Sequence, residues 1–92
     1  MDLLYFARKY IWWEPPEIAV QDRHRVIAQV MNLGTFEDAR SLLRQAGEME
    51  LKQALREARP GEFSARSWNY WHLILGVSPL QAVPPLPVRR FA

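Results

Sequence analysis

The apolar positions along this chain recur at helical spacing in four segments. Residues 22–33, 36–46, 48–58 and 64–76 each place apolar side chains three and four positions apart, on one face of a helix. The stripes expected to be buried are Val26, Ile27, Val30 and Met31; Phe36, Ala39, Leu42, Leu43 and Ala46; Leu51, Ala54, Leu55 and Ala58; and Trp68, Trp71 and Leu75 with Ile74 beside them. The pattern predicts four helices, each packed along one side against the rest of the chain.

Polar and glycine residues mark where these helices begin and end. Ser64 and Thr35 can each accept a hydrogen bond from a backbone N–H of the first turn, as N-cap residues do. Gly76 suits the left-handed position that follows a helix. Phe63 precedes the Ser64 cap, where an apolar side chain packs against the start of a helix. Apolar residues cover more of the segment 64–76 than a one-sided surface helix needs, so this segment is expected at the centre of the core or at an interface.

The two ends of the chain have a different character. Residues 3–13 are apolar and aromatic and predict a short helix, which a proline pair ends because proline disfavours helix in the residue before it. The alternative for residues 3–13 is an extended run that lies across the helices behind it. Residues 14–21 predict a turn or a single helical turn. Residues 77–92 contain four of the seven prolines and predict an extended, polyproline-like tail. The expected fold class is all-α, a compact bundle of four or five short helices over residues 1–76 followed by this tail.

Composition narrows the classes of function. A chain of 92 residues forms one domain, and 49% hydrophobic with 24% charged residues is typical of a folded protein. With no cysteine and two histidines, we expect no metal site and no cofactor. No apolar run approaches the ~18 residues of a membrane span, and the N-terminus does not resemble a signal peptide, which favours a cytoplasmic protein. The net charge of +2 is too small to indicate nucleic-acid binding by itself.

The aromatic residues are concentrated in two stretches. Nine of the eleven lie in residues 5–13 and 63–71. One interpretation is that the two stretches pack against each other and form the core. The other is that some of these rings are exposed and bind a partner, because tryptophan, tyrosine and arginine are enriched at binding hot spots. The candidate anchors are Trp12, Trp13, Trp68 and Trp71.

The tail offers a second candidate surface for a partner. Residues 84–89 match the proline-x-x-proline-x-arginine form that aromatic grooves bind. The alternative is a plain non-helical tail, which could still dock on a partner because a polyproline segment is already extended. The candidate contacts are Pro84, Pro85, Pro87, Arg89, Arg90 and Phe91.

Two other functions fit parts of the sequence. Residues 35–58 form a helix–glycine–helix pair, as in helix-turn-helix DNA-binding proteins. The outward residues of the second helix are close to neutral in sum, which disfavours entry into a groove of DNA. Arg66 and His72 match the loose arginine–histidine spacing of helical ribonucleases, although side chains six positions apart do not share a helix face. The candidate DNA contacts are Lys52, Arg56, Arg59 and Arg66.

Four stretches together resemble a family of small bacterial proteins. These proteins are encoded next to AbiEii-like nucleotidyltransferase toxins and are thought to act as their antitoxins. The resemblance covers roughly residues 4–77, and its motifs are hydrophobic and structural rather than catalytic. It rests on YFARKYIWW at 5–13, VIAQVMNLG at 26–34, ARSLL at 39–43 and SARSWNYWHLILG at 64–76.

The sequence favours a binding protein over an enzyme. The resemblance implies an antitoxin-like partner that occludes a nucleotidyltransferase-type toxin, with the exposed aromatic residues and the tail as contacts. A helix-turn-helix DNA-binding protein is the alternative, followed by a helical ribonuclease. A homodimer is a further option for the oligomeric state.

Overall fold

Six helices make up the regular structure of this chain. The computed structural model describes residues 2–77 and 83–88, and these residues contain no β-strand. The all-α class is confirmed, with six helices because the segments on both sides of the proline pair are helical. The helices are α1 (Leu3–Tyr10), α2 (Pro16–Ala19), α3 (Arg23–Leu33), α4 (Phe36–Ala46), α5 (Glu48–Arg56) and α6 (Ala65–Ile74).

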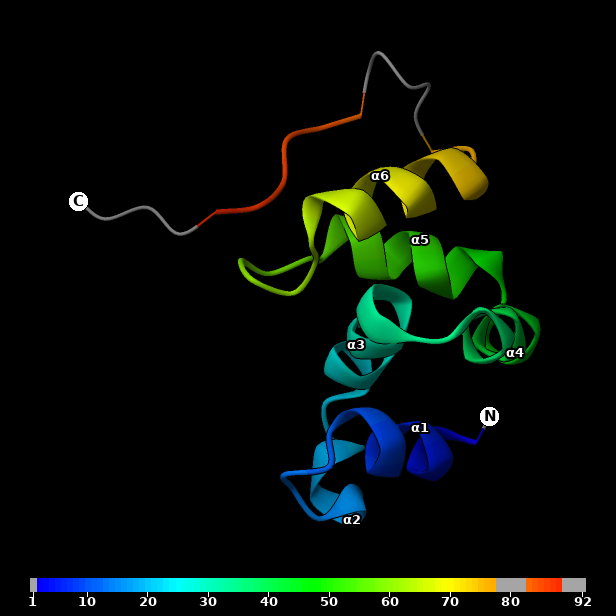
Figure 1. Cartoon of the computed structure of the whole chain (residues 1–92), viewed down its shortest axis with the longest axis vertical. Helices are drawn as coiled ribbons and strands as arrows, with labels where there is room; N and C mark the ends of the chain where they lie inside the picture. The colour runs from blue at the N-terminus through cyan, green and yellow to red at the C-terminus, as the bar shows by residue number, and fades with distance from the viewer. Residues whose placement is uncertain (1, 78–82, 89–92) are drawn as a thin grey trace.

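Helix α3 lies between two groups of helices (Figure 1). It contacts α1 and α2 on one side and α5 and α6 on the other, while α4 packs against both α3 and α5. The aromatic stretches 5–13 and 63–71 therefore pack on opposite sides of α3. The expectation that they pack against each other was wrong, because α3 supplies the apolar surface that each of them needs.

The predicted helix caps are confirmed. The Ser67 N–H donates to the Ser64 hydroxyl at 3.2 Å, and the Asp38 N–H donates to the Thr35 hydroxyl at 3.1 Å. Gly76 has φ +66°, and the N–H groups of Gly76 and Val77 donate to the carbonyls of Leu73 and His72. This pair of bonds is a Schellman motif, which satisfies carbonyls that the end of α6 would otherwise leave unpaired.

The buried stripes of α3, α4 and α5 largely follow the predicted periodicity, with one departure in α4 and one in α6. Phe36 is 69% exposed because it is the first residue of α4 and projects beyond the core. Ile74 is also exposed, and His72 takes the expected place of an apolar residue in the core. The His72 ring can enter the core because its Nδ1 lies 2.8 Å from the Trp68 carbonyl oxygen and so has a polar partner.

Residues 83–88 contain no helix and run beside α6 and the loop before it (Figure 1). Val83 and Leu86 pack against the core, and Trp68 Nε1–H donates a 2.7 Å hydrogen bond to the Pro84 carbonyl oxygen. This part of the tail thus lies against the helical domain. None of the helices in residues 2–77 combines the length and the apolar character needed to cross a bilayer.

Candidate protein-binding surface

A groove of about 460 Å³ opens between the end of α3, the start of α4 and the first half of α6. Two side chains of α6 join its walls by binding backbone carbonyls of α3. Trp71 Nε1–H donates to the Met31 carbonyl oxygen at 2.7 Å, and the Ser67 hydroxyl donates to the Asn32 carbonyl oxygen at 3.0 Å. These carbonyls belong to the last turn of α3 and have no partner within the helix. These two hydrogen bonds therefore fix the α6 wall of the groove to the last turn of α3.

Asn32 completes this attachment. Its side-chain oxygen accepts a hydrogen bond from the Ser64 N–H at 2.9 Å, at the residue that caps α6. A single residue thus contacts both the N-cap of α6 and, through its own carbonyl, the Ser67 hydroxyl one turn later. The end of α3 and the start of α6 are fixed relative to each other, so the groove is formed before any ligand arrives.

Aromatic and cationic side chains form the rim of the groove. Phe36 is 69% exposed and Tyr70 is 45% exposed, and both line the groove with Arg66. The Arg40 guanidinium lies 5.5 Å from the centre of the Phe36 ring. Neither Arg40 nor Arg66 forms an ion pair with a described residue. Exposed rings beside unpaired guanidinium groups are the residue types that dominate binding energy at protein interfaces.

The outer face of α6 continues the apolar surface away from the groove. Tyr70, Leu73, Ile74 and Val77 are all exposed, at positions i, i+3, i+4 and i+7 of α6 and its C-terminal turn. We call these four residues the outer strip. Side chains at this spacing form one continuous face. The opposite face of α6 is in the core, so this helix has apolar surface on two sides.

Trp12 and Trp13 form a second exposed aromatic surface, in the turn after α1. They are 75% and 55% exposed, and their ring centroids lie 5.6 Å apart in an edge-to-face arrangement. Two neighbouring indoles that expose this much surface are unusual for a side chain that is buried on average. The structure therefore leaves both of these predicted contact residues accessible to a partner.

Trp68 and Trp71 have the opposite placement. Both are buried, and each indole N–H is used within the chain, by Pro84 and Met31 respectively. As surface contacts these two predictions are corrected, because both rings face α3, α5 or the tail rather than solvent. Trp71 forms part of the groove wall.

The predicted contacts in the tail divide into three groups. Pro84 and Pro85 are exposed, while Pro87 is half-buried against the helical domain. Arg89, Arg90 and Phe91 lie outside the described residues. The three prolines thus lie beside Trp68, which was also predicted to contact a partner.

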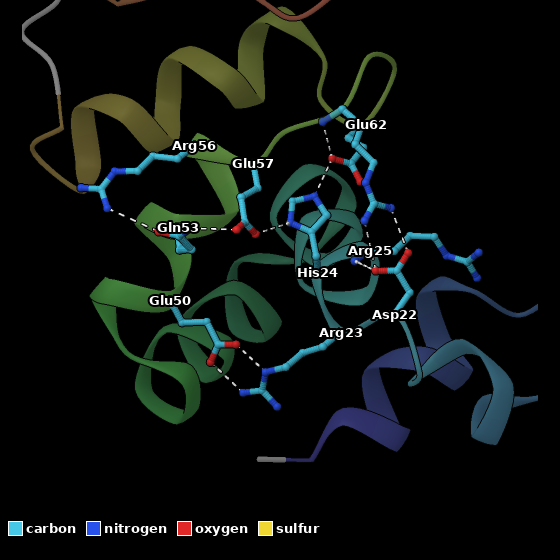
Figure 2. A network of polar contacts seen from close by, with 10 residues as sticks. Asp22, Arg23, His24, Arg25, Glu50, Gln53, Arg56, Glu57 and Glu62 are labelled. Atoms are coloured by element: carbon cyan, nitrogen blue, oxygen red, sulfur yellow. Dashed lines mark hydrogen bonds and ion pairs between the residues drawn. The ribbon is translucent and has the colours of Figure 1, made fainter.

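The four basic residues proposed for DNA do not form one surface. Lys52 lies 4.0 Å from Glu48, and Arg59 forms a 2.9 Å ion pair with Asp22. Arg56 donates to the Gln53 side chain (Figure 2), and the fourth candidate, Arg66, lines the groove. Lys52 and Arg59 have acidic partners, and Arg56 and Arg66 lie at different pockets, so these four residues form no continuous basic track for a phosphate backbone.

The arginine and histidine proposed for a ribonuclease are separated. Arg66 lies at the groove, whereas His72 is buried with its ring 4.2 Å from the Trp68 ring, on the side of α6 that faces the tail. Its Nδ1 is occupied by the Trp68 carbonyl. In this arrangement the two side chains cannot act on one phosphodiester.

A polar network ties the start of α3 to α5 and to the loop that leads into α6 (Figure 2). Arg59 lowers the pKa of Asp22 by donating to it, and Arg23 likewise lowers the pKa of Glu50. These contacts bind α3 to elements that follow it by about 25 to 40 residues, and their role is to position the helices. The pairs are Arg23 with Glu50, Arg59 with Asp22, and His24 with Glu62.

The residues that sequence reasoning missed are Phe36, Arg40 and Tyr70. Phe36 was assigned to the buried stripe because its spacing from Ala39 and Leu43 is helical. Its position directly after the Thr35 cap was the available signal, since a first-turn side chain often lies beyond the neighbouring helices.

No family model, curated protein or solved structure matches this chain.

Proposed function

We propose that this chain is a protein-binding module, and that the groove and the outer strip of α6 form its binding surface. The observation that carries the proposal is the exposure of Phe36 and Tyr70 at the rim of a preformed groove beside Arg66. A concave pocket with mixed polar and apolar walls, and with aromatic anchors and a cation at its edge, is typical of a site for a protruding side chain of a partner.

The charges at the rim indicate the chemistry of that partner. Neither Arg40 nor Arg66 forms an ion pair with a described residue, so a partner that brings carboxylates could pair with both. The groove itself has room for one large apolar or aromatic side chain. The partner surface would therefore carry an apolar anchor flanked by aspartate or glutamate, with a helix or another apolar face against the outer strip.

The resemblance to antitoxins suggests which protein carries such a surface. Three residues of the outer strip, Tyr70, Leu73 and Ile74, and the α6 wall of the groove come from the segment 64–76, which is the longest motif of that resemblance. We propose that the partner is a nucleotidyltransferase-type toxin and that binding blocks access to its active site. Such a mechanism requires no catalytic group of this chain, because the bound chain blocks the active site of the toxin by covering it.

The test uses the full-length tagged chain, recovered from cells of its own source. The variant Phe36→Ser/Tyr70→Ser removes both exposed anchors, and Leu4→Ser on α1 is the matched control because Leu4 is also exposed and apolar. A companion protein should bind the wild type and the control at equal stoichiometry and should bind the double variant at least thirtyfold more weakly. Retention by the double variant would rule out the groove.

Two further measurements distinguish the levels of the proposal. Loss of the companion from Trp12→Ser/Trp13→Ser, with retention by the groove variant, would move the interface to the turn after α1. Where a companion is purified, its nucleotidyltransferase activity should fall as the chain is added up to equal amounts. A companion with no such activity would contradict the antitoxin role and leave the binding surface as proposed.

A further inference from the structure

The side of α6 opposite the groove holds a second site, which the tail of the chain occupies. We call it the proline cradle and define it by Leu55, Ala58, Phe63, Trp68 and His72, which come from α5, the loop after it and α6. Residues 83–88 lie across this surface (Figure 1). No residue of the proline cradle lines the groove, so the inference does not depend on the proposed function.

Trp68 supplies the directional contact in the cradle. Its Nε1–H donates to the Pro84 carbonyl oxygen at 2.7 Å, and its ring is held between Phe63, at 5.7 Å between centroids, and His72, at 4.2 Å. Because His72 is itself anchored to the Trp68 carbonyl, the indole is fixed in place before it meets the tail. A rigid aromatic surface with one N–H donor is the arrangement by which grooves recognise extended proline-rich peptides.

The tail sequence shows what kind of chain fits the cradle. Val83 and Leu86 pack against the core on either side of the proline pair, three positions apart. Proline has no backbone N–H, so a proline-rich segment has few donors for its own carbonyl oxygens. Trp68 provides a donor for one of these oxygens. The ligand class is thus an extended segment with an apolar residue before a proline pair and another directly after it.

The tail is held by few contacts and is therefore replaceable. The bond from Trp68 is the only hydrogen bond that joins residues 83–88 to the rest of the described chain. Hollows of about 310 and 430 Å³ remain beside the segment, and Pro84, Pro85 and Val88 are exposed. A segment with one hydrogen bond and two apolar anchors belongs to the least stable part of a fold.

We infer that the proline cradle is a receptor for a proline-rich extended segment of a binding partner, and that residues 83–88 are its built-in competitor. Eight residues, 75–82, separate the end of α6 at Ile74 from Val83. A tether this short keeps the tail near the cradle at an effective concentration on the order of millimolar. A partner segment must displace the tail, so its apparent affinity for the intact chain is lower than its affinity for an empty cradle.

The experiment uses the full-length chain and a synthetic peptide of residues 83–92 as the probe. The variant Leu86→Asp removes the apolar anchor and should release the tail, whereas Val88→Asp adds the same charge at an exposed position and should not. The readout is the indole N–H resonance of Trp68 in each chain. Leu86→Asp should shift this resonance, and Val88→Asp should leave it in place.

Added peptide should then restore the Trp68 resonance of Leu86→Asp to its wild-type position. We expect at least tenfold tighter binding to Leu86→Asp than to the wild type or to Val88→Asp. A peptide with alanine in place of Pro84, Pro85 and Pro87 should bind at least tenfold more weakly. The additional change Trp68→Phe in the Leu86→Asp chain should weaken the binding of the unmodified peptide by a similar factor.

Three results would overturn the inference. The first is a Trp68 resonance that Leu86→Asp does not move, which would mean that the tail is not displaceable. The second is equal binding of the proline and alanine peptides, which would make the cradle a general apolar surface. The third is a wild-type dimer, seen by sedimentation, that Leu86→Asp dissociates, because the occupant would then be the tail of a second copy.

Discussion

The Tyr10 hydroxyl donates a 2.6 Å hydrogen bond to Asp38 Oδ2, which joins the end of α1 to the first turn of α4. Asp38 also accepts from the Tyr5 hydroxyl at 3.0 Å and pairs with Lys9 Nζ at 2.7 Å. The Thr35 N–H donates in turn to the Tyr10 oxygen. The buried Asp38 carboxylate thus binds three side chains of α1. Helix α1 is attached to the bundle by these bonds as well as by its packing against α3.

The substitution Asp38→Asn should destabilise the chain. The carboxylate accepts two hydroxyl bonds and one charged bond, and its removal leaves the buried Tyr10 hydroxyl with a poorer partner. A loss of about 2 to 3 kcal/mol is expected for such a charged acceptor. This corresponds to a fall in Tm of roughly 8 to 24 °C for a chain of this size.

Thermal unfolding followed by circular dichroism measures this change. Glu37→Gln is the matched control, since Glu37 is the neighbouring acid in the first turn of α4 and is exposed. The control should lie within about 0.5 kcal/mol of the wild type. Equal stability of Asp38→Asn and the wild type would show that the contact with α3 alone holds α1.

The contribution of Asp38 should also depend on pH. The hydrogen bonds from Lys9 and Tyr10 hold the pKa of Asp38 below its usual value of 3.8 in the folded chain. A carboxyl group with a lowered folded pKa stabilises the fold at pH above its unfolded pKa, and this stabilisation is lost as pH falls through the folded pKa. The difference in stability between the wild type and Asp38→Asn should therefore be constant from pH 5 to 8 and shrink below about pH 4.

Urea unfolding of both chains at a series of pH values provides the measurement. The difference in stability between the wild type and Asp38→Asn should also become smaller in strong alkali. Burial and the bond to Asp38 raise the pKa of Tyr10, so its stabilising contribution is complete below pH 10 and is lost as pH rises through the folded pKa. A difference in stability that does not change between pH 5 and 2.5 would mean that the pKa of Asp38 is the same in the folded and the unfolded chain.

The four tryptophans should divide into two classes of stability effect. Trp71→Ala removes a buried ring and its bond to Met31, which is expected to cost about 3 to 5 kcal/mol. Trp12→Ala removes a ring that is 75% exposed and should change stability by no more than about 0.5 kcal/mol. Chemical denaturation of the two single variants tests the contrast, and a large loss with Trp12→Ala would indicate that this ring is part of the core.

The attachment between α3 and α6 should depend on Asn32. Its side chain accepts from the Ser64 N–H, so Asn32→Ala leaves the cap of α6 without this support and should cost about 1 kcal/mol. Gln29→Ala is a suitable control, because Gln29 is half-buried on the same helix and makes a longer, 3.4 Å bond to the Tyr10 carbonyl. Hydrogen exchange of the first turn of α6 should rise in Asn32→Ala and not in the control.

Local signals along the sequence determined where the helices begin and end. Thr35 and Ser64 act as caps because their hydroxyls bond to N–H groups three residues later, and no distant part of the chain is needed for this. Gly76 ends α6 by a backbone conformation that glycine adopts at little cost. The all-α class, the four long helices and the non-helical tail residues 83–88 follow from such signals and from the apolar spacing.

Tertiary structure alone decided which aromatic residues are buried. Trp12 and Trp68 have the same chemistry, and helical periodicity cannot separate them. Trp68 is buried because α5 and the tail cover it, and Trp12 is exposed because it lies in a turn that none of the later described segments covers. Burial depends on what packs opposite a side chain, often 30 or more residues away, whereas a cap depends on its nearest neighbours. The groove and the proline cradle arise in the same way, because their walls come from segments that only the fold brings together.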